Sequence, residues 1–159
     1  MSETKTALYA VLCGFMYEEF VRLEGGVEVA VRDSTYQEPC QIERTRWLVK
    51  NVEDLPFLTN GHRSILEIGC SGGHQLLAMK GYAGVDVNPE IIEENRRKHP
   101  DTLWLCFNAV FWPDETVMPL PRFECVALPD VIEHLEFADA LKLIANVKQI
   151  AEHRILITT

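Results

Sequence analysis

The spacing of hydrophobic residues divides this chain into two parts near residue 61. In the first part, residues 6–23 carry apolar side chains at helical intervals and end before Gly25, which predicts a helix with a glycine C-cap. Residues 26–32 alternate valine with other residues, which predicts a short strand. Residues 41–52 return to helical spacing. We therefore expect residues 1–60 to form an N-terminal helical cap or lid that includes a short strand.

In the second part, residues 61–159, short apolar runs alternate with helical stretches. The apolar runs predict strands at Ile65–Ile68, Gly84–Val87, Leu103–Phe107, Phe123–Leu128 and Ile155–Thr158. The stretches between them predict helices near Gly73–Met79, Pro89–Lys98 and Phe137–Glu152. Strands that alternate with helices imply right-handed βαβ crossovers. The predicted fold class is therefore α/β, a Rossmann-like parallel sheet with helices on both faces.

Composition narrows the classes of function. The chain has a formal net charge of −9, and an acidic surface repels the phosphates of DNA and RNA, which disfavours nucleic acid as a partner. No apolar run is as long as a membrane span, and residues 1–10 lack the features of a secretory signal. The 5 cysteines are scattered without a C-x-x-C pair, which disfavours a disulfide framework and a cysteine zinc site. We expect a cytoplasmic protein.

Candidate binding residues fall where the predicted strands end. In parallel α/β sheets, ligands bind beyond the carboxyl ends of the strands. The segment Gly69–Gly73 follows the first predicted strand, and Asp86, Asn108 and Asp130 end or follow the next three. Because these ends meet at one edge of the sheet, the sequence predicts one ligand site there.

The glycine-rich turn is the most specific of these signals. Gly69 and Gly73 would let a ligand approach the backbone without a Cβ clash, and helix-start amides could receive a polar group. The alternative interpretation is a plain strand-to-helix turn, for which one glycine would suffice. The dinucleotide pattern G-x-G-x-x-G fits poorly, because Ser71 and His74 stand at its second and third glycines. An NAD-dependent oxidoreductase is therefore disfavoured.

Asp86 and Asn108 each allow two interpretations. The Asp86 carboxylate could accept hydrogen bonds from both ribose hydroxyls, or it could favour the helix dipole ahead of Pro89. We favour ribose binding, because the glycine turn is also present. The Asn108 amide could read an adenine edge, and a turn-forming asparagine is an equal alternative.

The segment after the fourth predicted strand carries three polar side chains, those of Asp130, Glu133 and His134. His134 could act as a general base, because histidine changes its charge near neutral pH. All three side chains could supply metal ligands. The alternative is structural: Asp130 caps a helix and Glu133 closes a capping box.

Together these motifs resemble the class I S-adenosylmethionine-dependent methyltransferases. Residues 65–73 look like their first motif, with Ser71 in place of its middle glycine. Residues 84–89 look like their second-strand motif. Residues 123–135 are similar to the fourth-strand segment of ubiquinone-biosynthesis-like and small-RNA-methylating members. The resemblance covers about residues 64–159.

The resemblance implies S-adenosylmethionine as cofactor and assigns residues to its parts. The expected cofactor-binding residues are Glu67, Gly69, Cys70, Ser71, Gly73, Asp86, Val87, Asn108, Ala109, Leu128 and Pro129. The turn from Gly69 would line the methionine part, Asp86 the ribose, and Asn108 the adenine. His134 and then Asp130 are the expected catalytic residues. The match to the metal cluster of the small-RNA methylators is partial, so we predict no bound metal.

The resemblance also implies the strand order 3-2-1-4-5, with Tyr36 and Trp47 of the cap near the cofactor mouth. Family members continue with a hairpin beside the fifth strand, whereas this sequence stops at Thr159. An uncovered strand edge favours aggregation, so we expect it to be covered by the strand of residues 27–31, by a second subunit in a homo-oligomer or a partner subunit, or by a missing C-terminal part.

Two hypotheses of function follow from the sequence. The first is a methyltransferase that acts on a small-molecule or protein acceptor, which the sequence does not identify. The second is a catalytically inactive cofactor-binding or regulatory partner subunit that lacks the C-terminal strands. Automethylation or hydrolysis assays with candidate acceptors would separate the two.

Overall fold

The computed structural model describes residues 19–23, 26–32, 40–54, 64–72, 76–112 and 120–159. Its elements are, in chain order, β1 (Glu19–Arg22), β2 (Glu28–Arg32), α2 (Cys40–Glu53), β3 (Ile65–Ile68), β4 (Tyr82–Asp86), α3 (Pro89–Lys98), β5 (Leu103–Cys106), β6 (Phe123–Pro129), η1 (Ile132–His134), α4 (Phe137–Ile150) and β7 (Ala151–Thr158). No helix in the described part of the chain is long and apolar enough to cross a membrane.

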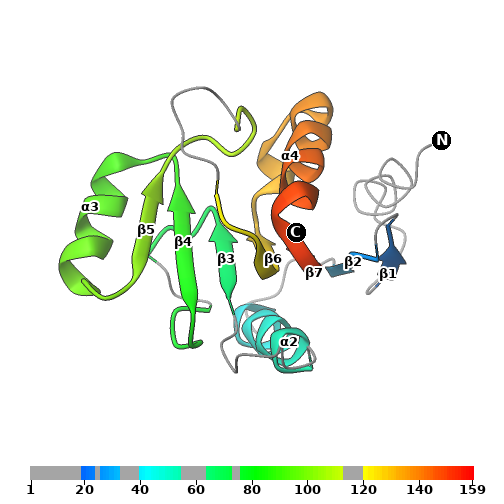
Figure 1. The fold of residues 1–159 in the computed structure, drawn as a ribbon, viewed down its shortest axis with the longest axis horizontal. Coiled ribbons are helices and arrows are strands. Elements are labelled where there is room, and N and C mark those ends of the chain that lie inside the picture. The colour runs from blue at the N-terminus through cyan, green and yellow to red at the C-terminus, as the bar shows by residue number, and fades with distance from the viewer. Residues whose placement is uncertain (1–18, 24–25, 33–39, 55–63, 73–75, 113–119) are drawn as a thin grey trace.

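One seven-stranded sheet organises these elements in the order β1-β2-β7-β6-β3-β4-β5 (Figure 1). All neighbouring strands are parallel except β1 and β2, which pair in the antiparallel direction. Counted from Ile65, the last five strands have the expected order 3-2-1-4-5, but the sheet has two more strands than the sequence predicted. Two strands from the N-terminal part extend the sheet beyond β7, while the five strands from Ile65 onward lie as β5-β4-β3-β6-β7.

The edge of β7 is paired within the chain. Strand β2 lies parallel to it, in a register that places Glu28 opposite Arg154 and Arg32 opposite Thr158. The prediction that this edge is covered is thereby confirmed, and β2 covers it. Residues 28–32 of the expected N-terminal cap are therefore part of the same sheet as the C-terminal strands.

The predicted helix of residues 6–23 is wrong at its end, where Glu19–Arg22 form β1. The Leu23 amide donates to the Val27 carbonyl at 2.7 Å, and Gly26 has a φ of +86°. This turn reverses the chain, so that strand pairing with β2 overrides the helical spacing of the residues before it. Residues 6–18 lie outside the described residues.

The predicted helix Gly73–Met79 is also wrong in its described part, where residues 76–80 form turns and a bend. The carbonyl of Gly81 accepts a hydrogen bond from the Ile65 amide at 3.0 Å, so the chain must return to the beginning of β3 within this connection. The connection is close to the minimum of about 10–12 residues that a βαβ crossover needs, so little length is left for a helix.

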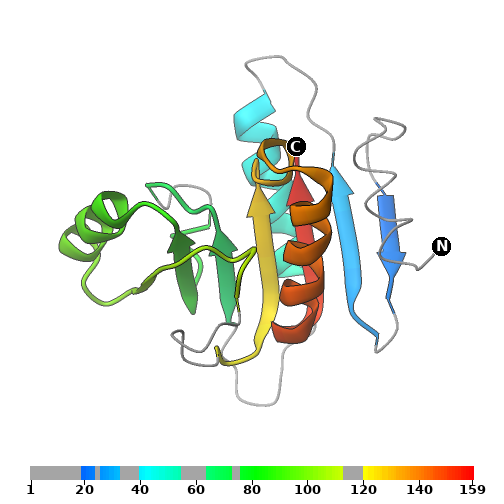
Figure 2. The same cartoon turned by 90° about the horizontal axis from the view of Figure 1, so that it is seen from above.

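Helices lie on both faces of the sheet, as Figure 2 shows. Helix α4 packs on one face through Leu143, Ile144 and Val147, and α2 and α3 pack on the other through Leu48 and Ile92. Trp47, expected near the cofactor mouth, is buried in the core of the α2 and α3 face. Tyr36 lies outside the described residues.

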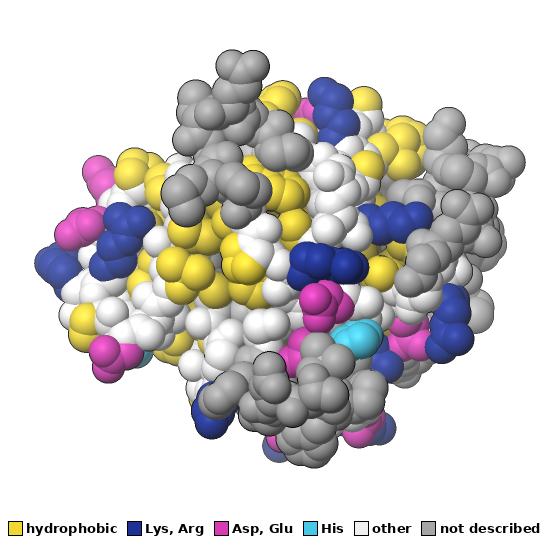
Figure 3. All heavy atoms as spheres, in the orientation of Figure 1, with side chains coloured by type: hydrophobic (Ala, Val, Ile, Leu, Met, Phe, Trp, Pro, Cys, Tyr) yellow, Lys and Arg dark blue, Asp and Glu magenta, His cyan; other side chains and the backbone are white. Residues whose placement is uncertain are grey.

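On the face of the sheet that carries α4, strands β4 and β5 are less covered by helix than β6 and β7. Among the described α-helices, only α4 packs on this face, and it covers β6 and β7. Figure 3 shows hydrophobic side chains over β3 to β5. Leu103 is 49% exposed at the start of β5, and the loop after this strand packs against the face through Ala109 and Val110. Asn146 of α4 donates hydrogen bonds to the carbonyls of both residues, so α4 also holds that loop.

Candidate functional site

A cavity of about 330 Å³ opens at the carboxyl ends of β3, β4, β5 and β6. Its polar lining comes from Asp86, Asn108, Asp130 and His134, together with the backbone at Gly69. Its apolar lining includes Val85, Phe107, Val110, Val131, Leu135 and Leu143. The structure thus brings together the four strand ends at which the sequence predicted a single site.

Gly69 is required for the first turn of the site. Its φ is +72°, a conformation that favours glycine, and a Cβ added there would lie 2.5 Å from Cγ2 of Val131. The Gly69 amide donates to the Val85 carbonyl at 2.8 Å. The turn after β3 is therefore packed against the turn after β6, and any side chain at position 69 would separate them.

Ser71 continues this turn in a left-handed conformation with a φ of +46°. Its amide donates to Oδ2 of Asp86 at 2.9 Å, and its carbonyl accepts from Nδ2 of Asn95 at 2.6 Å. Asn95 is buried on α3, only 2% exposed. The turn is thus held on one side by a strand-end carboxylate and on the other by a helix side chain. The Ser71 side chain itself is exposed and does not line the cavity.

The Asp86 carboxylate is oriented by two backbone amides. Oδ2 accepts from Ser71, and Oδ1 accepts from the Asn88 amide at 2.9 Å. Asn88 is the N-cap of α3, and its own side chain accepts from the Glu90 amide at 2.9 Å. Each carboxylate oxygen can accept further hydrogen bonds. Asp86 therefore presents a fixed pair of acceptors at the cavity, and the neighbouring Val87, 62% exposed, lines the same opening.

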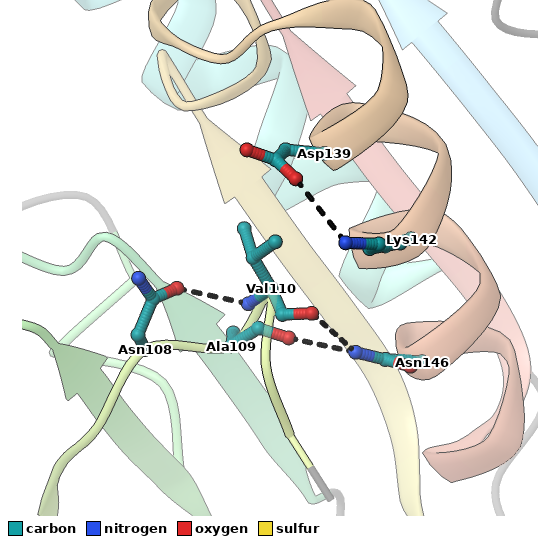
Figure 4. A network of polar contacts seen from close by, with 6 residues as sticks. All are labelled: Asn108, Ala109, Val110, Asp139, Lys142 and Asn146. Atoms are coloured by element: carbon teal, nitrogen blue, oxygen red, sulfur yellow. Dashed lines mark hydrogen bonds and ion pairs between the residues drawn. The ribbon is translucent and has the colours of Figure 1, made fainter.

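The loop after β5 forms the next wall. Oδ1 of Asn108 accepts from the Val110 amide at 3.0 Å, so Asn108 makes the turn that was one of its two sequence interpretations. In Figure 4 its Nδ2 points away from Val110. Asn146 of α4 donates from Nδ2 to the carbonyls of Ala109 and Val110 at 3.0 and 3.1 Å. The loop therefore has a defined conformation that α4 fixes.

Asp130 and His134 form the wall after β6. Asp130 has a φ of +54°, and its Oδ1 accepts from the Thr158 hydroxyl at 3.4 Å. His134 lies on η1, is exposed and lines the same cavity. The N-cap of η1 is Val131, which makes no side-chain capping hydrogen bond, so Asp130 is not the N-cap residue that the structural alternative assumed. Both expected catalytic residues are thus at the cavity.

A metal site does not assemble from this segment. In the part of the chain that the structure describes, no group of three histidine, cysteine, aspartate or glutamate side chains could hold a metal ion. Glu133, the third member of the sequence cluster, is exposed and does not line the cavity.

Several residues that the sequence assigned to the cofactor point elsewhere. Glu67 is 1% exposed, and burial raises its pKa from 4.5 to about 7, against the opposing effects of the Tyr82 hydroxyl and the Leu76 backbone amide. Cys70 packs in the core of the α2 and α3 face, where burial raises its pKa to about 12. Because successive strand residues alternate between the two faces, Glu67 points away from the face of Ile68, and Cys70, which follows the strand, packs with the core residues of that opposite face.

Two further expected residues, Leu128 and Pro129, are buried at the end of β6 and do not line the cavity. Gly73 lies outside the described residues. Ala109, 8% exposed, does line the cavity.

Sequence reasoning missed the residues that support the site from outside. Asn95 and Asn146 lie within helices and had no motif to mark them. Asparagine is a weak helix former, so an asparagine inside a predicted helix was the available signal. The apolar wall of Phe107, Val131 and Leu143 was also missed, because the pattern of its residues is that of any core.

No protein-family model matches this chain, and no curated protein sequence does. Solved structures of similar fold do exist. They include the glycopeptide N-methyltransferase MtfA in complex with S-adenosylhomocysteine, with a TM-score of 0.55, 15% identity, and coverage of 75% of this chain and 53% of that chain. The N-methyltransferase NodS from Bradyrhizobium japonicum WM9 has a TM-score of 0.53 and 21% identity, and the alignment covers 72% of this chain and 64% of NodS.

A third structure is that of CalS10, an amino pentose methyltransferase from Micromonospora echinaspora with S-adenosylmethionine bound. Its TM-score is 0.53 at 14% identity, with coverage of 74% of this chain and 53% of CalS10. This chain has the fold of the class I S-adenosylmethionine-dependent methyltransferases. It spans about half the length of MtfA and CalS10.

Proposed function

We propose that this chain binds S-adenosylmethionine in the cavity and transfers its methyl group to a small-molecule or protein acceptor. The observation that carries the proposal is the placement of the Gly69 turn and the Asp86 carboxylate at adjacent strand ends, on one cavity, within a methyltransferase fold.

The residues at the cavity suit the chemistry of this cofactor. Asp86 offers two oriented carboxylate oxygens as acceptors for a pair of ribose hydroxyls. Asn108 offers an amide donor for an adenine nitrogen, and Phe107 and Val110 offer apolar surface for the ring. The volume of about 330 Å³ lies within the range of small-molecule sites.

When bound, S-adenosylmethionine supplies an electrophilic methyl group. The role of the chain is to hold an acceptor in line with it, which is the main contribution of an enzyme to such a displacement. His134 lines the cavity and would accept a proton that the acceptor loses. Asp130 would orient the acceptor, and Thr158 fixes its carboxylate from the end of β7.

Calorimetric titration with S-adenosylhomocysteine tests the proposal. We expect micromolar binding to the wild type and at least a 100-fold loss with Asp86→Ala, because that change removes the acceptors and frees the turn at Ser71. Asp101→Ala is the matched control, since Asp101 is exposed and precedes β5, at the edge opposite the cavity. Absence of binding by the wild type would refute the proposal.

A further inference from the structure

Two asparagines on opposite faces of the sheet each hold one loop of the cavity. Asn95 lies on α3, and Asn146 lies on α4. Neither side chain lines the cavity. Both donate from the side-chain amide to main-chain carbonyls of a segment far away in the sequence.

Asn95 acts on the turn after β3. Its hydrogen bond of 2.6 Å to the Ser71 carbonyl holds a residue whose left-handed backbone is intrinsically unfavourable for a side chain. The amide of that same residue orients Asp86. Two successive hydrogen bonds therefore connect the buried Asn95 side chain, through the backbone of Ser71, to the Asp86 carboxylate at the cavity.

Asn146 acts on the loop after β5. It bridges the carbonyls of Ala109 and Val110, and Figure 4 shows its amide facing both. These two residues are buried against the α4 face, and both line the cavity. These bonds from α4 add to the hydrogen bond between Asn108 and Val110 within the loop, and they join the loop to a helix. Lys142, one turn earlier on α4, lies 5.5 Å from the ring centroid of Phe111 in the same loop.

We propose that Asn95 and Asn146 are positioning residues that set the affinity for the cofactor without touching it. The proposal rests on the proposed function, and it assigns a different part of the ligand to each asparagine. Asn146 fixes the loop after β5, the cavity wall that would lie beside the adenine ring. Asn95 fixes the Ser71 turn and, through it, the Asp86 carboxylate, which would lie beside the ribose and the amino-acid part of the ligand.

The test is calorimetric titration of Asn95→Ala and Asn146→Ala with S-adenosylhomocysteine. Loss of one or two such hydrogen bonds should raise the Kd about tenfold in each variant. Titration with adenosine, followed by NMR, separates the roles. Asn146→Ala should weaken adenosine and S-adenosylhomocysteine by the same factor, whereas Asn95→Ala should weaken S-adenosylhomocysteine more. Asn146→Gln, which keeps a donor on a longer side chain, should recover part of the loss.

Asn51→Ala is the matched control. Asn51 is 7% exposed on α2, and its amide also donates to a carbonyl, that of Trp47 at 3.0 Å, but within its own helix. This variant should lose stability and keep the wild-type Kd. A merely structural role of the two cavity asparagines would make all three variants alike in binding.

The outcomes separate the two proposals. If the wild type binds and both cavity variants stay within twofold of its Kd, the positioning role is refuted and the proposed function stands. If the wild type does not bind, the proposed function fails, and the positioning role fails with it. If Asn95→Ala does not fold, Asn146→Ala decides, because Asn146 is only half-buried.

Discussion

The two faces of the sheet around β3 differ in their surroundings, because one is a closed core and the other opens onto the cavity. On the face of α2 and α3, Glu67 and Cys70 are buried, and burial raises the pKa of both. On the other face, Ile68 and the bare backbone of Gly69 open onto the cavity. Residues that are adjacent in one motif thus have unrelated environments, because strand residues alternate between faces. A motif identifies the edge of the sheet where a ligand binds, but only the alternation shows which of its residues can reach the ligand.

The largest expected effect is on the cavity side, with Gly69→Ala. The new Cβ would meet Val131 at 2.5 Å in a backbone conformation with a φ of +72°. We expect a loss of about 3 kcal/mol in the free energy of unfolding, from overpacking and left-handed strain, and no measurable binding of S-adenosylhomocysteine. Urea unfolding and calorimetry measure the two effects.

Gly26→Ala is the control for this change. Gly26 has a similar φ of +86°, but a Cβ there would meet no atom within 4 Å. It should cost about 1 kcal/mol and leave binding intact. Adding Val131→Ala to Gly69→Ala should restore part of the stability, and equal effects of the two glycine variants would argue against the tight contact of the two turns.

The next effect is on the opposite face, with Glu67→Gln. The pKa of Glu67 in the folded protein is about 7, above its value of 4.5 without burial. The folded state therefore holds a proton that the unfolded state has lost, so the stabilising contribution is present below pH 4.5 and disappears as the pH rises through 7. The wild type should lose about 2–4 kcal/mol across this range from Glu67.

Glu67→Gln should remove this decline and be more stable than the wild type at pH 8. Urea unfolding at pH 5 and pH 8 measures the difference. Because Glu67 does not line the cavity, its variant should bind S-adenosylhomocysteine as the wild type does. A large loss of affinity would place Glu67 in the ligand site and break the distinction between the faces.

The smallest effect concerns thiol reactivity. Burial raises the pKa of Cys70 and of Cys125 to about 12, whereas Cys106 is exposed. In the folded protein at pH 8, iodoacetamide should modify Cys106 well before either buried cysteine, because the thiolate is the reactive form. Mass spectrometry of digests reports each site. Modification of Cys70 at the rate seen in guanidinium would show that its face is open.

The sequence predicted the central elements well. The predicted Ile65–Ile68 and Pro89–Lys98 agree with β3 and α3 to the residue. These segments are either apolar runs or are bounded by local signals, such as the Asn88 cap before Pro89. Such signals involve residues only a few positions apart, so they can be recognised in the sequence alone.

The elements that sequence reasoning missed depend on distant partners. β1 forms because it pairs with β2, and β7 begins at Ala151 because that residue lies opposite Phe123. At the site, the sequence located the strand ends that carry Asp86, Asn108 and Asp130. It could not show that Asn146 reaches a loop 36 residues earlier, because helical spacing carries no information about a partner.

The most direct test of the account is an NMR titration of the wild-type protein with S-adenosylhomocysteine. Saturable shifts of the backbone amides should be largest at Gly69, Asp86, Asn108 and His134, and smallest along α2. Absence of saturable shifts, or shifts centred on α2, would contradict the claim that the cavity at the carboxyl edge is the cofactor site.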